Sequence, residues 1–252
     1  MGLFDLIFGK LKKQVKEQKI RDGRKAECPY CYKLLEKIPA RKKQCPHCGE
    51  FMFVRTKPKN NIRVVVTKQE AEQIDEEWSI VTGDHDSYVA EKEEFEKEKN
   101  ILKKRFGEEP SDDDIKWGIL NKKYGKHAND GNWGLFRNTR FEMAEICRKK
   151  MKLEQALLFY LEVCYLDLNG PNNTGGINDP ELLKINPPFN PKFSFLAPAV
   201  INFIKRIVKK LEYSKEKVKS IFMEHNLQVE KSLKLPLSAN NCWDLLEKEI
   251  WK

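Results

Sequence analysis

The stretch Cys28-Pro29-Tyr30-Cys31, followed by Cys45-Pro46-His47-Cys48-Gly49, decides the fold of the first part of this chain. Thirteen residues separate the two Cys-Pro-x-Cys units. In each unit the proline fixes φ and turns the chain sharply, so both sulfur atoms can point at one ion. Gly49 can adopt the positive φ that turns backbone N–H groups toward the thiolates. We therefore predict a metal site whose ligands are Cys28, Cys31, Cys45 and Cys48.

Over residues 26–57 these two cysteine units, and the apolar and basic run at residues 51–56 after them, resemble the zinc-ribbon family with rubredoxin-type knuckles. The resemblance implies a small β fold. One departure is Tyr32, which stands where a glycine would follow the first pair. Four thiolates suit zinc or iron, but the two knuckles are much closer in sequence than those of rubredoxins, which favours zinc. We expect one structural zinc ion per chain.

The predicted ion holds structure and does not activate water, because four thiolates leave no open coordination position. A ribbon this small has little core, so metal binding supplies most of its folding free energy. His47 is predicted to face solvent and not to be a fifth ligand. The sequence contains no Ser-His-Asp order, paired-carboxylate signature, nucleotide fingerprint or zinc-hydrolase motif. An enzyme is therefore the less favoured class, and no catalytic or organic-cofactor residue is assigned.

The other three cysteines are scattered, at Cys147, Cys164 and Cys242, and leave an odd total of seven. This pattern does not suit a disulfide scaffold, and paired Cys-x-x-Cys units in a reducing compartment hold metal. No apolar run approaches the roughly 20 residues that a membrane helix needs, and residues 1–8 lack the features of a secretory signal. We expect a cytoplasmic protein, with Cys147 and Cys164 in the core of a helical hairpin.

Charge is distributed unevenly along the chain. Residues 1–63 carry 17 Lys and Arg against 6 Asp and Glu, residues 64–115 carry 7 against 17, and residues 116–252 carry 23 against 15. The basic first segment has two interpretations: it contacts phosphates or anionic lipid, or it pairs with the acidic segment that follows. Residues 1–17 also have apolar side chains at helical spacing between lysines, which predicts a basic amphipathic helix. Such a helix docks on the protein's own body, in a partner's groove or peripherally on an anionic membrane.

Four regions follow along the chain. We predict a basic amphipathic helix at 1–25, the zinc ribbon at 26–57, an acidic linker with helices at 58–115, and an α-helical domain at 116–252. The last contains a helical hairpin at about 133–170 and a Gly-, Pro- and Asn-rich loop at 169–195. Helix starts are predicted from four capping residues: Thr67, Ser111, Ser214 and Ser238.

The hairpin resembles a single tetratricopeptide repeat, with small residues at the close crossing of its helices. Met151 stands at the turn position where that family has glycine, and no second or third copy is present, whereas a solenoid needs about three. A hairpin packed inside a larger α domain is the alternative. The packing positions that carry the resemblance are Phe141, Ala144, Cys147, Met151, Leu153, Ala156, Tyr160 and Val163.

As a whole, the chain also resembles uncharacterised zinc-ribbon proteins of Gram-positive bacteria and their prophages, a resemblance that implies no activity. Two functions remain. The first is a non-catalytic, zinc-binding adaptor whose helical domain binds a protein partner. The second is nucleic-acid binding through the basic first 63 residues, with Tyr30, Tyr32 or Phe53 stacking on bases. The sequence leaves the oligomeric state open.

Overall fold

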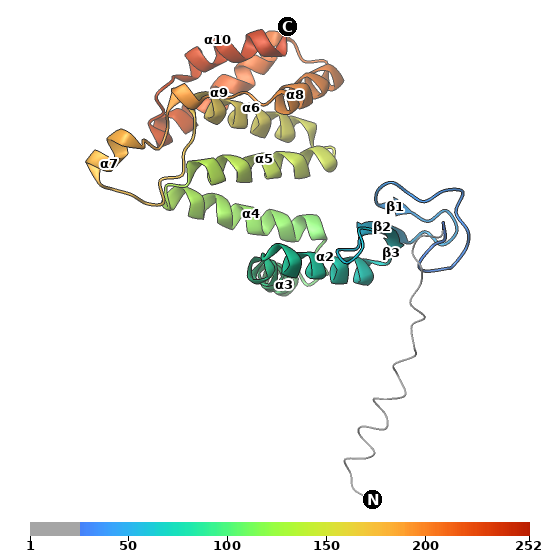
Figure 1. The fold of residues 1–252 in the computed structure, drawn as a ribbon. Coiled ribbons are helices and arrows are strands. Elements are labelled where there is room, and N and C mark those ends of the chain that lie inside the picture. Colours follow the sequence, from blue (N-terminus) through green and yellow to red (C-terminus); the bar gives the residue numbers. More distant parts are fainter. Residues whose placement is uncertain (1–25) are drawn as a thin grey trace, which may run out of the picture. The chain divides into compact units, whose positions relative to one another are not determined.

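The structure is a computed structural model that describes residues 26–252 (Figure 1), so the amphipathic helix predicted at 1–25 lies outside the described residues. The described residues divide into two compact units, 26–93 and 94–252, and the division falls within helix α3 (His85–Phe106). The predicted combination of a small β module and a mainly helical body is confirmed for the described residues. Among these residues no helix is long and apolar enough to cross a membrane.

The sheet of the first unit has three antiparallel strands in the order β1, β2, β3. They are β1 (Lys43–Gln44), β2 (Phe51–Thr56) and β3 (Arg63–Val66). β2 is central, with Lys43 opposite Met52 on one side and Val65 opposite Val54 on the other. The run at 51–56 therefore forms a strand as its composition indicates. The third strand lies beyond residue 57, the predicted end of the ribbon.

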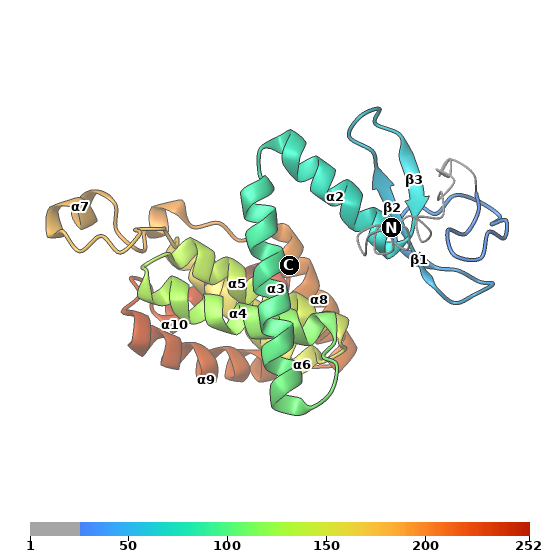
Figure 2. The ribbon, with the colours of Figure 1, turned by 90° about the horizontal axis from the view of Figure 1, so that it is seen from below.

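The two faces of this sheet bury different partners because successive side chains of a strand point to opposite sides. Met52 and Val65 pack against Cys28 and Cys45. On the other face, Phe53, Val64 and Val66 pack with helix α2 (Lys68–Thr82), through Ala71, Ile74 and Trp78. The sheet is thus held between the cysteine knuckles and α2, and Figure 2 shows α2 beside the strands.

Helix α2 is fixed to the sheet at both its start and its middle. The predicted capping box is confirmed: the Thr67 hydroxyl accepts the Glu70 N–H and the Glu70 carboxylate accepts the Thr67 N–H. Arg55 of β2 forms a two-point ion pair with Asp75, at 2.7 and 2.9 Å. The Trp78 indole N–H also donates to the Thr56 carbonyl at 2.6 Å. These contacts make α2 part of the β module.

The helical unit is built from the end of α3 and from seven further α-helices among the described residues, with one short 3-10 helix, η1. The caps predicted at Ser111, Ser214 and Ser238 are confirmed, each hydroxyl accepting a first-turn N–H. In chain order the elements are α4 (Asp112–Asn129), α5 (Trp133–Lys149), α6 (Leu153–Asn169), α7 (Pro180–Ile185), η1 (Pro191–Phe193), α8 (Pro198–Leu211), α9 (Lys215–Leu233) and α10 (Ala239–Ile250).

Helix α6 is the centre of this unit, with α5 on one side and α8, α9 and α10 on the other (Figure 1). From Ala156 to its end, every residue of α6 except Leu158 is buried, as in a helix surrounded by other elements. The carboxylate of Glu162, fully buried, accepts hydrogen bonds from the Tyr124 hydroxyl at 2.9 Å and His225 Nε2 at 2.6 Å and pairs with Arg140 at 2.9 Å. Although burial acts to raise the pKa of Glu162, the His225 hydrogen bond and the Arg140 charge lower it.

Helices α5 and α6 form an antiparallel hairpin joined by residues 150–152, and α4 packs on its outer side. Ala144 and Ala156, the small residues singled out in the sequence, are both fully buried. Met151 has φ of 59°, so this turn adopts the left-handed conformation without a glycine. The hairpin needs that conformation to reverse direction in three residues.

The Gly-, Pro- and Asn-rich segment after α6 is an ordered loop that caps α5. Asn132, which precedes α5, makes no capping bond with its own side chain. Instead the Trp133 N–H donates to the Asn172 carbonyl at 3.0 Å and the Leu135 N–H to the Asn173 Oδ1 at 3.1 Å. The loop thereby supplies hydrogen-bond acceptors for N–H groups in the first turn of α5, which have no acceptor within the helix.

Gly170 starts this loop in the left-handed conformation, with φ of 62°, and a Cβ there would lie 2.0 Å from the Asn190 carbonyl oxygen. We expect Gly170→Ala to lower the unfolding free energy by about 3 kcal/mol. Alanine is disfavoured at positive φ, and its Cβ would also displace the backbone at Asn190. Gly175→Ala is the matched control, because Gly175 also has positive φ but meets nothing within 4 Å. It should cost about 1 kcal/mol. Urea unfolding followed by circular dichroism measures both; equal losses would contradict the proposed clash.

Candidate metal centre

The structure brings the four predicted cysteines together on the face of the sheet that carries Met52 and Val65. All four sulfur atoms lie within 4.8 Å of one another. The Cys28 and Cys48 sulfur atoms are 3.7 Å apart, and those of Cys31 and Cys45 are 3.9 Å apart. A zinc–sulfur bond of about 2.3 Å requires sulfur atoms about 3.8 Å apart in a regular tetrahedron. Two of the six sulfur pairs therefore have this spacing, and all four sulfur atoms are close enough to bind one metal ion.

Two turns with the same hydrogen bonds present these sulfur atoms. In the first, the Tyr32 N–H donates to the Cys28 carbonyl at 3.0 Å, and the Cys28 N–H to the Lys33 carbonyl at 2.9 Å. In the second, Gly49 donates to Cys45 at 3.0 Å and Cys45 to Glu50 at 2.8 Å. The first cysteine of each turn also accepts an N–H on its sulfur at 3.4 Å, from Tyr30 and from His47.

Tyr32 and Gly49 occupy equivalent positions in the two turns. Tyr32 has φ of 60° and Gly49 has φ of 79°, so both lie in the left-handed region. The absence of glycine after the first pair therefore does not change the geometry of the first knuckle. A left-handed non-glycine residue costs about 1–2 kcal/mol, and here this conformation serves the cluster.

Neighbouring thiols change the pKa values of Cys45 and Cys48. Burial acts to raise the pKa of Cys45, but the N–H groups of His47 and Cys48 and the neighbouring thiols lower it to about 6. For Cys48, the Glu50 N–H acts to lower the pKa, whereas burial and the other three thiols raise it to about 12. Without a cation, the negative charge of one thiolate disfavours ionisation of the next thiol. A divalent metal ion relieves that repulsion, which is why thiolate sites couple metal binding to proton release.

Side chains of the sheet cover the cluster on one side. Cys28 and Cys45 are 0% and 2% exposed, and Met52 and Val65 cover them. His47 is exposed, as predicted, and its Nε2–H donates to the Leu34 carbonyl at 3.1 Å, which ties the second knuckle to the chain that leaves the first. No sequence pattern predicts this bond, because its acceptor is a backbone carbonyl and not a side chain.

The three scattered cysteines do not join the cluster. Cys147, Cys164 and Cys242 are buried in the core of the helical unit, at 2% exposure or less, as the sequence predicted for the first two. Burial raises the pKa of each thiol. They therefore act as small apolar residues and not as reactive thiols.

The arrangement offers four sulfur ligands and no further ligand position, so it suits a structural ion better than one that activates water. Comparisons of the chain with family models, curated proteins and solved structures found no match.

Substituting Tyr32 tests whether its left-handed backbone conformation matters for metal binding. Tyr32→Gly and Tyr32→Val both remove the ring, but only valine is strongly disfavoured at positive φ. We expect the valine variant to bind zinc about tenfold more weakly than the glycine variant, the equivalent of about 1.4 kcal/mol. Competition with a chromophoric chelator measures both affinities. Equal affinities would show that the first knuckle does not depend on this conformation.

Proposed function

We propose that this protein is a non-catalytic, zinc-binding interaction protein in which a structural zinc ion holds the β module and the helical unit binds a protein partner. The observation that carries the proposal is the closed set of four sulfur atoms at tetrahedral spacing. Zinc is preferred to iron on the short spacing between the two knuckles. On this proposal the β module is a zinc ribbon and the α5–α6 hairpin is a tetratricopeptide-like packing unit in a cytoplasmic protein.

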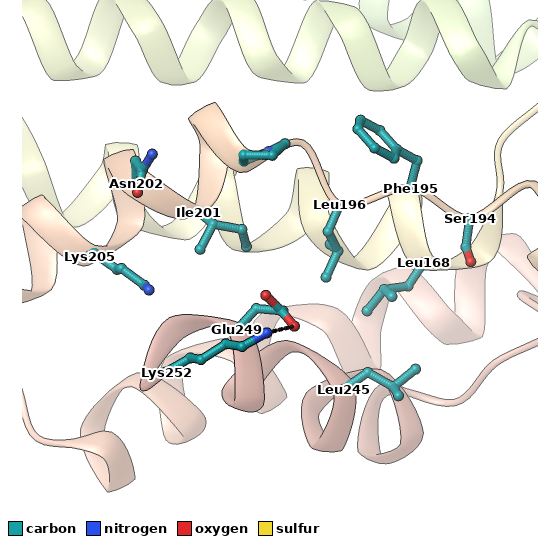
Figure 3. Close-up of a pocket in the computed structure, with 11 residues that line it drawn as sticks. Leu168, Ser194, Phe195, Leu196, Ile201, Asn202, Lys205, Leu245, Glu249 and Lys252 are labelled. Carbon is teal, nitrogen blue, oxygen red and sulfur yellow. Dashed lines mark ion pairs between the residues drawn. The ribbon is translucent and has the colours of Figure 1, made fainter.

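A groove in the helical unit supports the choice of a protein partner. It has a volume of about 540 Å³ and lies between α10 and the start of α8. In Figure 3, Leu196 and Ile201 point toward α10, which carries Leu245 and Glu249. Apolar walls of this kind can take the apolar face of a peptide, and the charged groups at the rim are Lys205 and the Glu249–Lys252 ion pair.

Exposed apolar side chains extend this groove along the loop before α8. Phe195, which lines the groove, is 68% exposed, and Phe193 is 78% exposed. Leu245, on the opposite wall, is 45% exposed. Large aromatic residues exposed beside a groove are the side chains that contribute most to protein–protein binding.

Metal content tests the first part of the proposal. Purified protein should carry about one zinc ion per chain, and Cys48→Ser should release it, because three thiolates hold zinc less well than four. Cys147→Ala, at a buried cysteine outside the cluster, should keep the zinc. Acidification should also expel the metal, since protons compete for the thiolates.

Elemental analysis gives the zinc content of each protein, and circular dichroism at 222 nm follows the helices. The helical signal should remain in Cys48→Ser, because the core of the helical unit contains no cluster residue. Iron in place of zinc, or a loss of most helix together with the metal, would contradict the proposal.

Partner capture tests the second part. Full-length, zinc-loaded protein should retain a specific partner from extracts of its source cells, identified by mass spectrometry. Phe195→Ser with Leu245→Ser should abolish that capture by making the groove walls polar. Ile185→Ser is the control, since Ile185 is 82% exposed but lies outside the groove. The proposed site is wrong if both variants capture the partner as well as the unmodified protein does, or if Ile185→Ser alone loses the partner.

A further inference from the structure

The β module carries positive charge that its own carboxylates do not neutralise. Residues 26–63 contain nine Lys and Arg but three Glu. Among residues 26–252, Arg55 is the only one of these nine cations in an ion pair with a carboxylate, that of Asp75. Seven of the other eight side chains are exposed. Four thiolates on one zinc ion add a charge of about −2, so the segment stays basic when it holds metal.

Pairing with the following acidic segment was one interpretation of this charge. Helix α2 contains five carboxylates, and one of them, Asp75, pairs with Arg55 of the basic segment. Glu76 instead pairs with Lys92 of α3, at 3.6 Å. The described contacts therefore leave most of the cations available to an anionic partner.

One of these cations, Lys42, contacts an exposed aromatic ring, and three more lie near Lys42 along the chain or across the sheet. We define the ribbon patch as Arg41, Lys42, Lys43, Phe51 and Arg63, all exposed. The Lys42 ammonium lies 4.7 Å from the centre of the Phe51 ring and 4.9 Å from that of Phe53. Arg63 of β3 donates to the Ala40 carbonyl, which brings it beside the chain that carries Arg41 and Lys42. Phe51 itself is 50% exposed.

From this juxtaposition we infer that the ribbon patch binds single-stranded nucleic acid. Lysine and arginine neutralise phosphates, and an exposed ring beside them stacks on an unpaired base. Tyr32, on the first knuckle, is a second exposed ring, at 64% exposure. A lipid surface or an acidic protein would use the same charges but has no base to stack on Phe51. The inference goes beyond the proposed function and rests on it only in that zinc must hold the β module.

The structure changes which rings can take part. The Tyr30 hydroxyl accepts the Lys68 N–H at 3.0 Å, so this ring is engaged at the start of α2. Phe53 is partly buried against α2. Of the three rings named from the sequence, Tyr32 alone is exposed, and Phe51 was missed because alternation along β2 could be assigned only once its partners were known.

Fluorescence anisotropy of labelled dT12, rU12 and a 12-base-pair DNA duplex, with the full zinc-loaded chain, tests this inference. We expect single strands to bind, with an affinity about 20-fold lower at 200 mM than at 50 mM NaCl, the change for about three phosphate contacts. Arg41→Gln with Lys43→Gln should weaken binding at least about tenfold and reduce the salt dependence. Phe51→Leu should weaken single-strand binding about tenfold through loss of one stacked base, and duplex binding less.

The control is Lys209→Gln with Lys210→Gln, which removes the same charge from two exposed residues of α8. It should change affinity less than twofold. Zinc is measured in every variant, so that failure of the patch and failure of the metal site are distinguished. The inference is overturned if no oligonucleotide binds at 50 mM NaCl, or if both double variants weaken binding equally. It is also overturned if vesicles of phosphatidylcholine and phosphatidylserine bind through the patch while the oligonucleotides do not.

Discussion

Repulsion between four sulfur atoms is the constraint on which the β module depends. With every pair of these atoms within 4.8 Å, the cluster can hold its full charge only around a cation. The knuckles, the strand that covers them and the helix on the far side of that strand are arranged so that four ligands from two separate turns meet. Because apolar contacts in this module are few, a metal ion held by the four cysteines would supply the stability that a larger core supplies elsewhere.

In the helical unit, buried carboxylates are paired with arginine side chains. Its central helix, α6, carries Glu162 and Asp167 among apolar residues, and each is matched by an arginine from α5: Arg140 at 2.9 Å and Arg137 at 2.6 Å. Arg140 also lies over the rings of Tyr124 and Phe159, at 4.0 and 4.5 Å. Buried pairs of this kind are often weak sources of stability but penalise alternative packings, because a shift of one helix would leave a charge unpaired.

Local signals in the sequence predicted the features that depend on neighbouring residues. The cysteine spacing indicated the cluster, the capping box at Thr67 indicated the start of α2, and three serines indicated the starts of α4, α9 and α10. Features that join distant residues were missed. The pairing of β3 with β2, the capping of α5 by Asn173 and the bond from His47 to the Leu34 carbonyl all rest on three-dimensional proximity that no local pattern encodes.

Strand β2 has a consequence for how this module can be exchanged between proteins. Its residues alternate between the knuckles and α2: Met52 packs on the cysteines, while Phe53 and Arg55 face the helix. A recombination boundary between β2 and α2 would leave an apolar sheet face uncovered, and insertion of one residue within β2 would exchange the two faces. A transfer of this module between proteins therefore has to include the whole segment from the first knuckle to the end of α2. The cysteine cluster and the acidic helix belong to that one segment.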